Sequence, residues 1–245
     1  MKSINNINFY KSLYMDSFFP TNDEFFVVIH FHGGGLVEGD KGDTHSFCEQ
    51  LANKGYAVFT ANYSLLMEDK FPRMLYDAAK AVKYVKENIS KYGKCKGLIL
   101  SGQSAGAWIV QMLCFNKEYL ASVGIDNKDI YAWFSESGQP TAHFNILKLE
   151  KGLSPDLEII DETAPIYYVN KDTRFSNLLL IAYENDIYNR LNQTKMLFEK
   201  IKGLNKTAKV EFKVLKGNHC DGSCKLDENG EFPVVNIIDC WIKSL

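Results

Sequence analysis

The sequence predicts an α/β fold in which a mostly parallel central sheet is flanked by helices. Short apolar runs of strand length alternate with longer segments whose apolar side chains recur every three or four residues, the order typical of βαβ units. Hydrophobic residues make up 46% of the 245 positions and charged residues 24%, which allows a large core beneath a charged surface. Because neither a repeat nor a linker interrupts this order, we expect one domain over residues 1–245.

The first elements follow one another closely. After an extended amino-terminal region, the continuous apolar run 25–31 predicts a buried strand that ends shortly before three glycines. A helix is expected over about 43–54, and the apolar run 56–61 predicts the next strand. Over about 72–90 the apolar residues fall on one helical face, so this helix should pack against the sheet.

A strand, a tight turn and a helix then follow without a break. Strand 97–101 leads into a turn rich in small residues and then into a helix over 107–113. A further strand is expected at 130–134. The segment of about 136–170 contains several glycines and prolines and is too broken for one regular element, which favours a small lid.

The last part of the chain again alternates strands and helices. Apolar runs at 177–183 and 210–215 predict two strands, and the segment of about 188–201 between them predicts a helix. A final amphipathic helix covers about 234–245. Helices between successive strands are what a parallel sheet requires.

Composition excludes several classes of function. The 28 basic and 30 acidic side chains leave a formal net charge of −2, so no basic field would draw the chain onto nucleic acid or an anionic membrane. No apolar run approaches the roughly twenty residues of a membrane-spanning helix. The amino terminus lacks the apolar stretch of a secretory signal, and we therefore expect a cytoplasmic protein that acts on a small molecule.

The six cysteines are expected to be free thiols. All lie far apart except Cys220 and Cys224, and a chain of this length needs no disulfide staples. Because these two cysteines follow His219, the segment could contribute ligands to a metal site. No second pair of Cys or His residues with ligand spacing accompanies them, which argues against such a site. We expect neither a metal nor a cofactor, and the sequence assigns no role to the two thiols.

One segment carries the signature of a nucleophile. Gly102-Gln103-Ser104-Ala105-Gly106 matches the pattern G-x-S-x-G and lies between a predicted strand and a predicted helix. In this pattern the serine occupies a strained turn, and small flanking residues let the backbone turn that tightly. This context predicts that Ser104 is a nucleophile rather than an incidental loop serine.

A second motif follows the first predicted buried strand. The amides of the run His32-Gly33-Gly34-Gly35 can project above the nucleophile, where a tetrahedral intermediate places negative charge on oxygen. We expect the N–H groups of Gly34, Gly35 and Ala105 to form this oxyanion hole, with His32 ordering the loop. The alternative, a phosphate-binding loop, lacks both the Walker lysine pattern and G-x-G-x-x-G.

A serine nucleophile needs a histidine base and a carboxylate that holds the histidine tautomer. Only His143 and His219 follow Ser104, and His219 comes just after a predicted strand, where sites of α/β folds assemble. His143 lies in the lid segment and is expected to be a pocket wall or surface residue. Asp186, a few residues beyond another strand, is the preferred acid, and Glu184 stays open as the alternative.

Together these motifs resemble the esterase and lipase branch of the α/β-hydrolases, particularly hormone-sensitive-lipase-like carboxylesterases and bacterial feruloyl or acetyl esterases. The resemblance spans nearly the whole chain and includes, in the order those enzymes use, Gly39-Asp40-Lys41, Asn62-Tyr63-Ser64, Phe71-Pro72 and Asp77-Ala78-Ala79-Lys80-Ala81. It implies the α/β-hydrolase fold, a triad of Ser104, Asp186 and His219, an acyl-enzyme intermediate and no cofactor.

The resemblance favours a carboxylesterase that hydrolyses small or aromatic esters, with Leu36, Trp108 and Phe144 as candidate pocket residues. The short lid argues against long-chain triglycerides. An arylformamidase or small peptidase stays an alternative, although arylformamidases usually carry tryptophan where this chain has Leu36. A catalytically silent ligand-binding protein is the other alternative, but such proteins usually lose a triad member. The sequence leaves open the acyl and alcohol parts of the substrate and whether the chain forms a homodimer.

Overall fold

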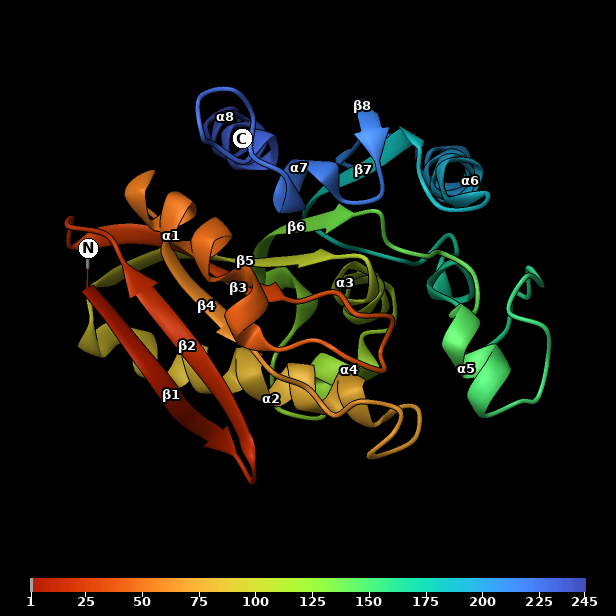
Figure 1. Ribbon diagram of the computed structural model, residues 1–245, viewed down its shortest axis with the longest axis horizontal. Coiled ribbons are helices and arrows are strands. Elements are labelled where there is room, and N and C mark those ends of the chain that lie inside the picture. Colours follow the sequence, from red (N-terminus) through yellow and green to blue (C-terminus); the bar gives the residue numbers. More distant parts are fainter. Residues whose placement is uncertain (1) are drawn as a thin grey trace.

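The computed structural model describes residues 2–245, which form one eight-stranded sheet (Figure 1). The strand order is β1-β2-β4-β3-β5-β6-β7-β8. Neighbouring strands from β4 to β8 are parallel, whereas β2 is antiparallel to both β1 and β4, which confirms the predicted mostly parallel sheet. The strands are β1 (Lys2–Tyr10), β2 (Leu13–Phe19), β3 (Glu24–Phe31), β4 (Ala57–Ala61), β5 (Lys94–Gln103), β6 (Ile130–Glu136), β7 (Asn177–Asn185) and β8 (Val210–Asn218).

Helices cover both faces of the sheet, as parallel strands require. Two of them, α1 and α8, pack on one face, and α2, α3 and α6 pack on the other, as Figure 1 shows. The α-helices are α1 (His45–Asn53), α2 (Arg73–Asn88), α3 (Ala105–Phe115), α4 (Glu118–Ala121), α5 (Phe144–Leu149), α6 (Arg190–Leu204), α7 (Asp221–Cys224) and α8 (Pro233–Lys243). Short 3₁₀ helices lie at Lys41–Thr44, Ile89–Lys91, Asn127–Asp129 and Pro165–Tyr168.

The central strands bury side chains on both faces. In β7, Leu178 and Leu180 join the core beneath α2, α3 and α6, whereas Leu179 and Ile181 join the core beneath α1 and α8. Burying a side chain of this kind contributes about 1.5–3 kcal/mol before conformational entropy is subtracted. This two-sided burial is the reason that such strands occur in the sequence as continuous apolar runs.

The amino-terminal region is more regular than the sequence predicts. Strands β1 and β2 form a hairpin that adds two antiparallel strands at one edge of the sheet. Most side chains of β1 are exposed, so no apolar run marks this strand in the sequence. For the same reason β5 begins at Lys94 rather than near 97: its first residues are not buried, but they pair with β3.

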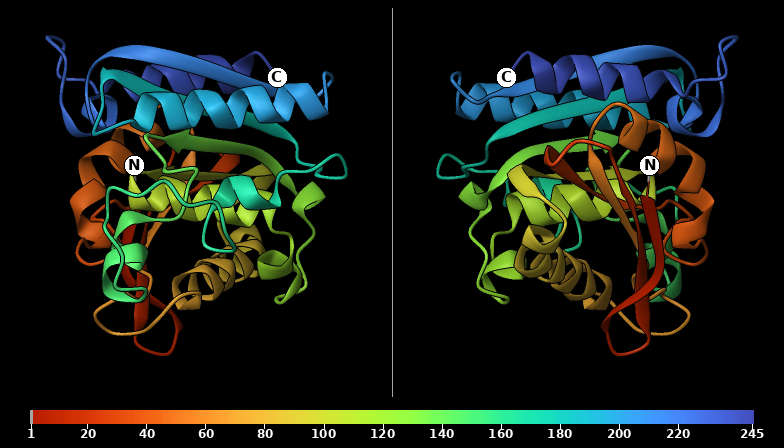
Figure 2. Two further views of the ribbon diagram at one scale, coloured as in Figure 1. Left: turned by 90° about the vertical axis from the view of Figure 1, so that its right-hand side faces the viewer. Right: turned by 90° about the vertical axis from the view of Figure 1, so that its left-hand side faces the viewer.

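The segment between β6 and β7, which we call the insertion, contains little regular structure. Within residues 137–176, regular structure is limited to α5 and the 3₁₀ helix Pro165–Tyr168. In the left view of Figure 2, α5 and the loop after β8 lie at the same end of the sheet. The insertion therefore borders the carboxyl ends of the parallel strands, where sites of α/β folds assemble.

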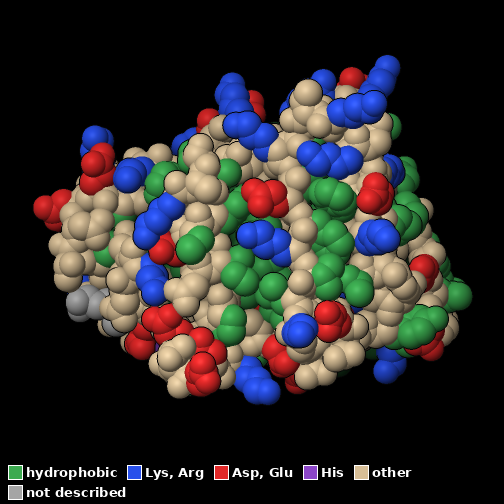
Figure 3. Space-filling model, turned by 90° about the horizontal axis from the view of Figure 1, so that it is seen from above, with side chains coloured by type: hydrophobic (Ala, Val, Ile, Leu, Met, Phe, Trp, Pro, Cys, Tyr) green, Lys and Arg blue, Asp and Glu red, His purple; other side chains and the backbone are tan. Residues whose placement is uncertain are grey.

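The surface carries mixed charge. On the face formed by α6, β8 and α8, basic and acidic side chains are interspersed (Figure 3). This face therefore has no single-sign patch of the kind that a phosphate backbone requires. Among residues 2–245, the helices are all too short or too polar to span a bilayer.

Candidate active site

Ser104 lies on a strained turn between β5 and α3. Its backbone has φ 52° and ψ −115°, a conformation that residues other than glycine rarely adopt. The flanking glycines make the turn possible: a Cβ at Gly102 would lie 2.3 Å from the backbone oxygen of Gly106, and one at Gly106 would lie 1.9 Å from that of Phe31. The helix therefore approaches the end of β3 closely, and Ser104 is held partly exposed at its first turn.

The structure brings Ser104, His219 and Asp186 together in one hydrogen-bonded row. His219 Nε2 lies 2.8 Å from Ser104 Oγ, and His219 Nδ1 lies 2.5 Å from Asp186 Oδ1. Because Nδ1 donates to the carboxylate, Nε2 is free to accept the serine proton. The three residues follow β5, β8 and β7 respectively, so each is delivered by the carboxyl end of a parallel strand.

The Asp186 carboxylate is held from two sides. Its Oδ2 accepts a hydrogen bond from the Ser137 hydroxyl at 2.7 Å, and its Oδ1 accepts one from Ile187 N at 2.9 Å besides that from His219. Burial raises the pKa of Asp186, but the hydrogen bonds from His219 and Ser137 outweigh burial, and the pKa lies below its ordinary value. Asp186 is therefore ionised at neutral pH.

Ser137 and Arg190 brace this side of the site, and no local pattern marks either of them in the sequence. Ser137 has φ 54°, and its backbone oxygen accepts a hydrogen bond from Arg190 Nη1. Arg190 Nη2 also donates to Gln139 Oε1 at 3.1 Å. Burial lowers the pKa of Arg190 to about 10, with Asp186 opposing that shift, so the guanidinium stays charged at neutral pH.

The loop after β3 presents free backbone amides beside the nucleophile. A Cβ at Gly33 would lie 3.4 Å from Ser104 Cβ, so the loop runs directly past the serine. Within residues 2–245, the N–H groups of Gly34, Gly35 and Ala105 donate to no acceptor. The backbone of Gly34 has φ 101° and that of Gly35 has φ 62°, both in the region that favours glycine. These amides are available to a substrate oxygen.

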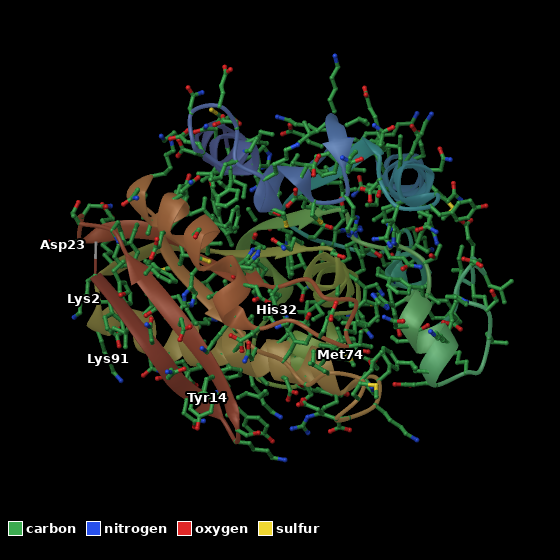
Figure 4. The ribbon with its side chains drawn as sticks, in the orientation of Figure 1. Lys2, Tyr14, Asp23, His32, Met74 and Lys91 are labelled. Atoms are coloured by element: carbon green, nitrogen blue, oxygen red, sulfur yellow. The ribbon has the colours of Figure 1, made fainter. Side chains whose placement is uncertain are left out.

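His32 orders this loop. Its Nδ1 donates to the Gly33 backbone oxygen at 2.7 Å, and its ring stacks on Tyr63 with centroids 4.4 Å apart. The Tyr63 hydroxyl donates to the His32 backbone oxygen at 2.9 Å. Figure 4 places His32 in the middle of the molecule. Burial lowers the pKa of His32, so the ring is neutral at neutral pH and acts on the loop as a hydrogen-bond donor.

Helix α5 reaches the same loop from the insertion. Asn145 Nδ2 donates to the Gly35 backbone oxygen at 2.7 Å. The Phe144 ring lies beside Gly35: a Cβ added to Gly35 would lie 3.4 Å from Phe144 Cζ. The insertion thus fixes one end of the row of amides. Asn145 is a supporting residue whose only signal in the sequence is its place in the lid segment.

A pocket of about 180 Å³ opens between α5 and the start of α6. Of the three predicted pocket residues, Phe144 lines this cavity, whereas Leu36 and Trp108 are 0% exposed and pack in the core beneath α2 and α3. These two side chains therefore have no surface that a substrate can touch. The pocket lining is Gln139, Phe144, Pro155, Asp156, Leu157, Glu158, Ile187, Tyr188, Arg190 and Gln193.

The remaining sequence candidates lie outside the hydrogen-bonded row. Glu184 is exposed, and the carboxylate that contacts His219 is that of Asp186. His143 is buried against Phe144, and burial lowers its pKa to about 3. In the part of the chain that the structure describes, no group of three or more His, Cys, Asp or Glu side chains is arranged to hold a metal ion, the cysteines around α7 included.

Glu136, at the end of β6, should make stability depend on pH. Its side chain is fully buried, and burial raises its pKa from 4.5 to about 7. The stabilising effect of the neutral carboxyl is therefore fully present below about pH 4.5 and is lost as the pH rises through about 7. We compare the free energy of unfolding of Glu136→Gln with that of the wild type. We expect this difference to shift in favour of the variant by on the order of 3 kcal/mol between about pH 5 and about pH 8. Urea titrations of both proteins at about pH 5 and about pH 8 measure the two differences. If the variant and the wild type differ by the same free energy at both pH values, the prediction is wrong.

Part of the sequence is similar to known esterases. Residues 15–131 match the BD-FAE family. Over 97 residues, or 38% of the chain, the sequence is 38% identical to Esterase LipI of Mycobacterium tuberculosis. Over 95 residues, or 33% of the chain, it is 30% identical to 3-O-acetylpapaveroxine carboxylesterase CXE1 of Papaver somniferum. Each match spans 30% of the relative's length, so the chain covers less than a third of these curated relatives.

Nearly the whole chain superposes on solved esterase structures. For Esterase B from Lactobacillus rhamnosis the TM-score is 0.80 at 17% identity, with 99% of this chain and 84% of that one covered. For Thermogutta terrifontis esterase 2 the TM-score is 0.76 at 16% identity, with coverages of 95% and 89%. The structures establish the fold, and the BD-FAE match includes both the glycine loop and the Ser104 turn. The chain therefore has the α/β-hydrolase fold of these solved esterases, and its residues 15–131 are similar to the BD-FAE family.

Proposed function

We propose that this protein is a serine carboxylic-ester hydrolase that acts through Ser104, Asp186 and His219. The observation that carries the proposal is the hydrogen-bonded row, in which His219 Nε2 lies 2.8 Å from Ser104 Oγ and Nδ1 lies 2.5 Å from Asp186 Oδ1. This geometry suits proton transfer from the serine to the imidazole. Relatives named as esterases support an ester as the bond that is cleaved.

In the first half of the reaction, the serine oxygen attacks the ester carbonyl while His219 takes its proton. Asp186 stabilises the resulting imidazolium. The amides of Gly34, Gly35 and Ala105 donate to the oxyanion, and each donor of this kind contributes about 3 kcal/mol to the transition state. His219 then protonates the leaving alcohol, and an acyl-enzyme forms.

In the second half, His219 removes a proton from water, and the resulting hydroxide attacks the acyl carbon. The second tetrahedral intermediate collapses to release the acid, and the proton on His219 returns to Ser104. All proton transfers use residues of the row, so the reaction needs no cofactor.

We take the cavity between α5 and α6 as the substrate pocket, because its lining residue Phe144 lies beside Gly35 and its lining residue Ile187 directly follows Asp186. It supports a small or aromatic ester as substrate. Its volume of about 180 Å³ and its lining of aromatic and aliphatic side chains with a few polar groups suit a short acyl chain or a single ring. We assign the insertion between β6 and β7 the role of a small lid, since Phe144 and residues 155–158 line this pocket. The free cysteines support a reducing compartment such as the cytoplasm.

A fluorophosphonate probe tests the nucleophile. We expect it to label the wild type but not Ser104→Ala, because phosphonylation requires the activated serine hydroxyl. Thermogutta terrifontis esterase 2, which shares this fold, is known in a form phosphonylated by cyclosarin. In parallel, kcat/KM for aryl acetates should fall by at least about a thousandfold in Ser104→Ala.

The alternatives give different results in the same assays. Failure of the probe to label folded wild-type protein would overturn the hydrolase and favour a ligand-binding role on this scaffold. Faster hydrolysis of N-formylkynurenine or of peptides than of aryl and feruloyl esters would move the activity to amide bonds. Circular dichroism of Ser104→Ala confirms that the lost labelling does not come from unfolding.

A further inference from the structure

We propose that Glu136 and Tyr183 are positioning residues that set the spacing between Ser104 and His219. A buried series of hydrogen bonds runs from Ser104 through Glu136 and Tyr183 to Gly222. We call this series the elbow link. This inference rests on the proposed function, because it concerns the alignment of the same nucleophile and base.

At one end, the elbow link holds the turn that carries the nucleophile. Ser104 N donates to the Glu136 backbone oxygen at 2.8 Å. From Ile99 onward, β5 pairs in register with β6 as far as Gln103 and Glu136, so this hydrogen bond continues the ladder into the strained turn. The position of the Glu136 backbone therefore determines where the serine lies.

At the other end, the elbow link holds the turn that follows His219. The Tyr183 hydroxyl donates to Glu136 Oε1 and accepts from Gly222 N at 2.7 Å. Gly222 permits this approach, since a Cβ there would lie 2.3 Å from Tyr183 Oη and 3.2 Å from Glu136 Oε1. Gly222 is three residues beyond His219, so a single hydroxyl connects the loop of the base to the turn of the nucleophile.

Packing alone does not account for a polar pair at this place. Glu136 is 0% exposed and Tyr183 is 1% exposed, and Tyr183 belongs to the apolar core beneath α1 and α8. Burying a carboxyl group costs free energy, and well-packed apolar side chains often stabilise such a position at least as well. A fixed distance between two loops is what the hydrogen bonds supply and apolar contacts do not.

The titratable groups around Glu136 leave the elbow link intact near neutral pH. Tyr183, Asp186, Cys220 and Cys224 all influence its surroundings. Burial raises the pKa of Tyr183 and of both thiols, so these three groups keep their protons. Tyr183 therefore remains a donor to Glu136 near neutral pH.

Tyr183→Phe removes the central hydroxyl, and Tyr56→Phe is a matched control. Tyr56 is also buried in the core beneath α1 and α8 and donates to Asp239 Oδ1 at 3.0 Å, but it precedes β4 at the end of the sheet away from the site. We expect Tyr183→Phe to lower kcat about 10- to 100-fold, with KM changed by no more than about twofold. Tyr56→Phe should retain wild-type kcat, although both variants lose thermal stability.

Two further measurements separate positioning from stability. Glu136→Leu should reproduce the loss of kcat, whereas Glu136→Gln, which keeps a side-chain oxygen for Tyr183, should restore most of it. The far-downfield proton NMR signal of the hydrogen bond between His219 and Asp186 should shift or broaden in Tyr183→Phe but not in Tyr56→Phe. This signal is observable whether or not the protein turns over an ester.

Each outcome decides one of the two proposals. If the fluorophosphonate probe does not label the wild type, the proposed function fails, while a changed proton signal in Tyr183→Phe still supports the elbow link. If Tyr183→Phe and Tyr56→Phe have the same kcat and the same proton signal, the elbow link is overturned, while the proposed function stands on the labelling of Ser104.

Discussion

Replacing Asp186 by asparagine is expected to lower kcat by about four orders of magnitude with little change in KM. The carboxylate accepts the Nδ1 proton of His219, which leaves Nε2 available for the proton of Ser104. Because the Ser137 hydroxyl donates to the other carboxylate oxygen, the amide oxygen of the variant is favoured there and its NH₂ group faces His219. That donor stabilises the tautomer with a proton on Nε2, which cannot act as the base. Steady-state kinetics on an aryl acetate measure the loss.

Glu184→Gln is the matched control for this substitution. Glu184 lies two residues before Asp186, is exposed, and forms no side-chain hydrogen bond or ion pair within residues 2–245. We therefore expect kcat to stay within about twofold of wild type, as for most surface substitutions. A larger loss in Glu184→Gln than in Asp186→Asn would transfer the role of the acid to Glu184.

The residues that can be predicted from the sequence are those with local requirements. Ser104 needs small neighbours because its turn is strained, and the loop after His32 needs glycine because its backbone adopts positive φ. Both requirements leave a pattern in consecutive positions. His219 and Asp186 leave no such pattern, but the order of strands indicates them, because parallel strands gather their carboxyl ends at one edge of the sheet.

The supporting residues could not be predicted because their partners are distant in the chain. Ser137 reaches Asp186 across 49 positions, and Asn145 reaches Gly35 across 110. Only the folded chain brings these ordinary polar side chains to their partners. A position next to a functional loop can also mislead. Leu36, a predicted pocket residue, directly follows the glycine loop, but its backbone has φ 64° and its side chain is fully buried in the core.

Gly106→Ala is expected to lower the unfolding free energy by about 3 kcal/mol or more and to remove most of the activity. The added Cβ would lie 1.9 Å from the Phe31 backbone oxygen and 2.6 Å from that of His32. Neither backbone atom can rotate aside, so α3 has to move away from β3 and to carry Ser104 with it. A displacement of about 1 Å at the nucleophile costs roughly a hundredfold in rate. Urea denaturation and kcat/KM measure the two effects.

Gly203→Ala separates this steric effect from the general effect of replacing a glycine. Gly203 is exposed near the end of α6, and no atom lies within 4 Å of the Cβ position. Alanine favours the helix, so we expect this variant to gain about 0.5–1 kcal/mol of stability at unchanged kcat. If Gly→Ala lowers stability at position 106 but raises it at position 203, the close approach of α3 to β3 is the reason that position 106 requires glycine. If Gly106→Ala instead has the stability and activity of the wild type, α3 can move away from β3 without cost. In that case the close contact between Gly106 and the end of β3 does not hold Ser104 beside the amides of the glycine loop.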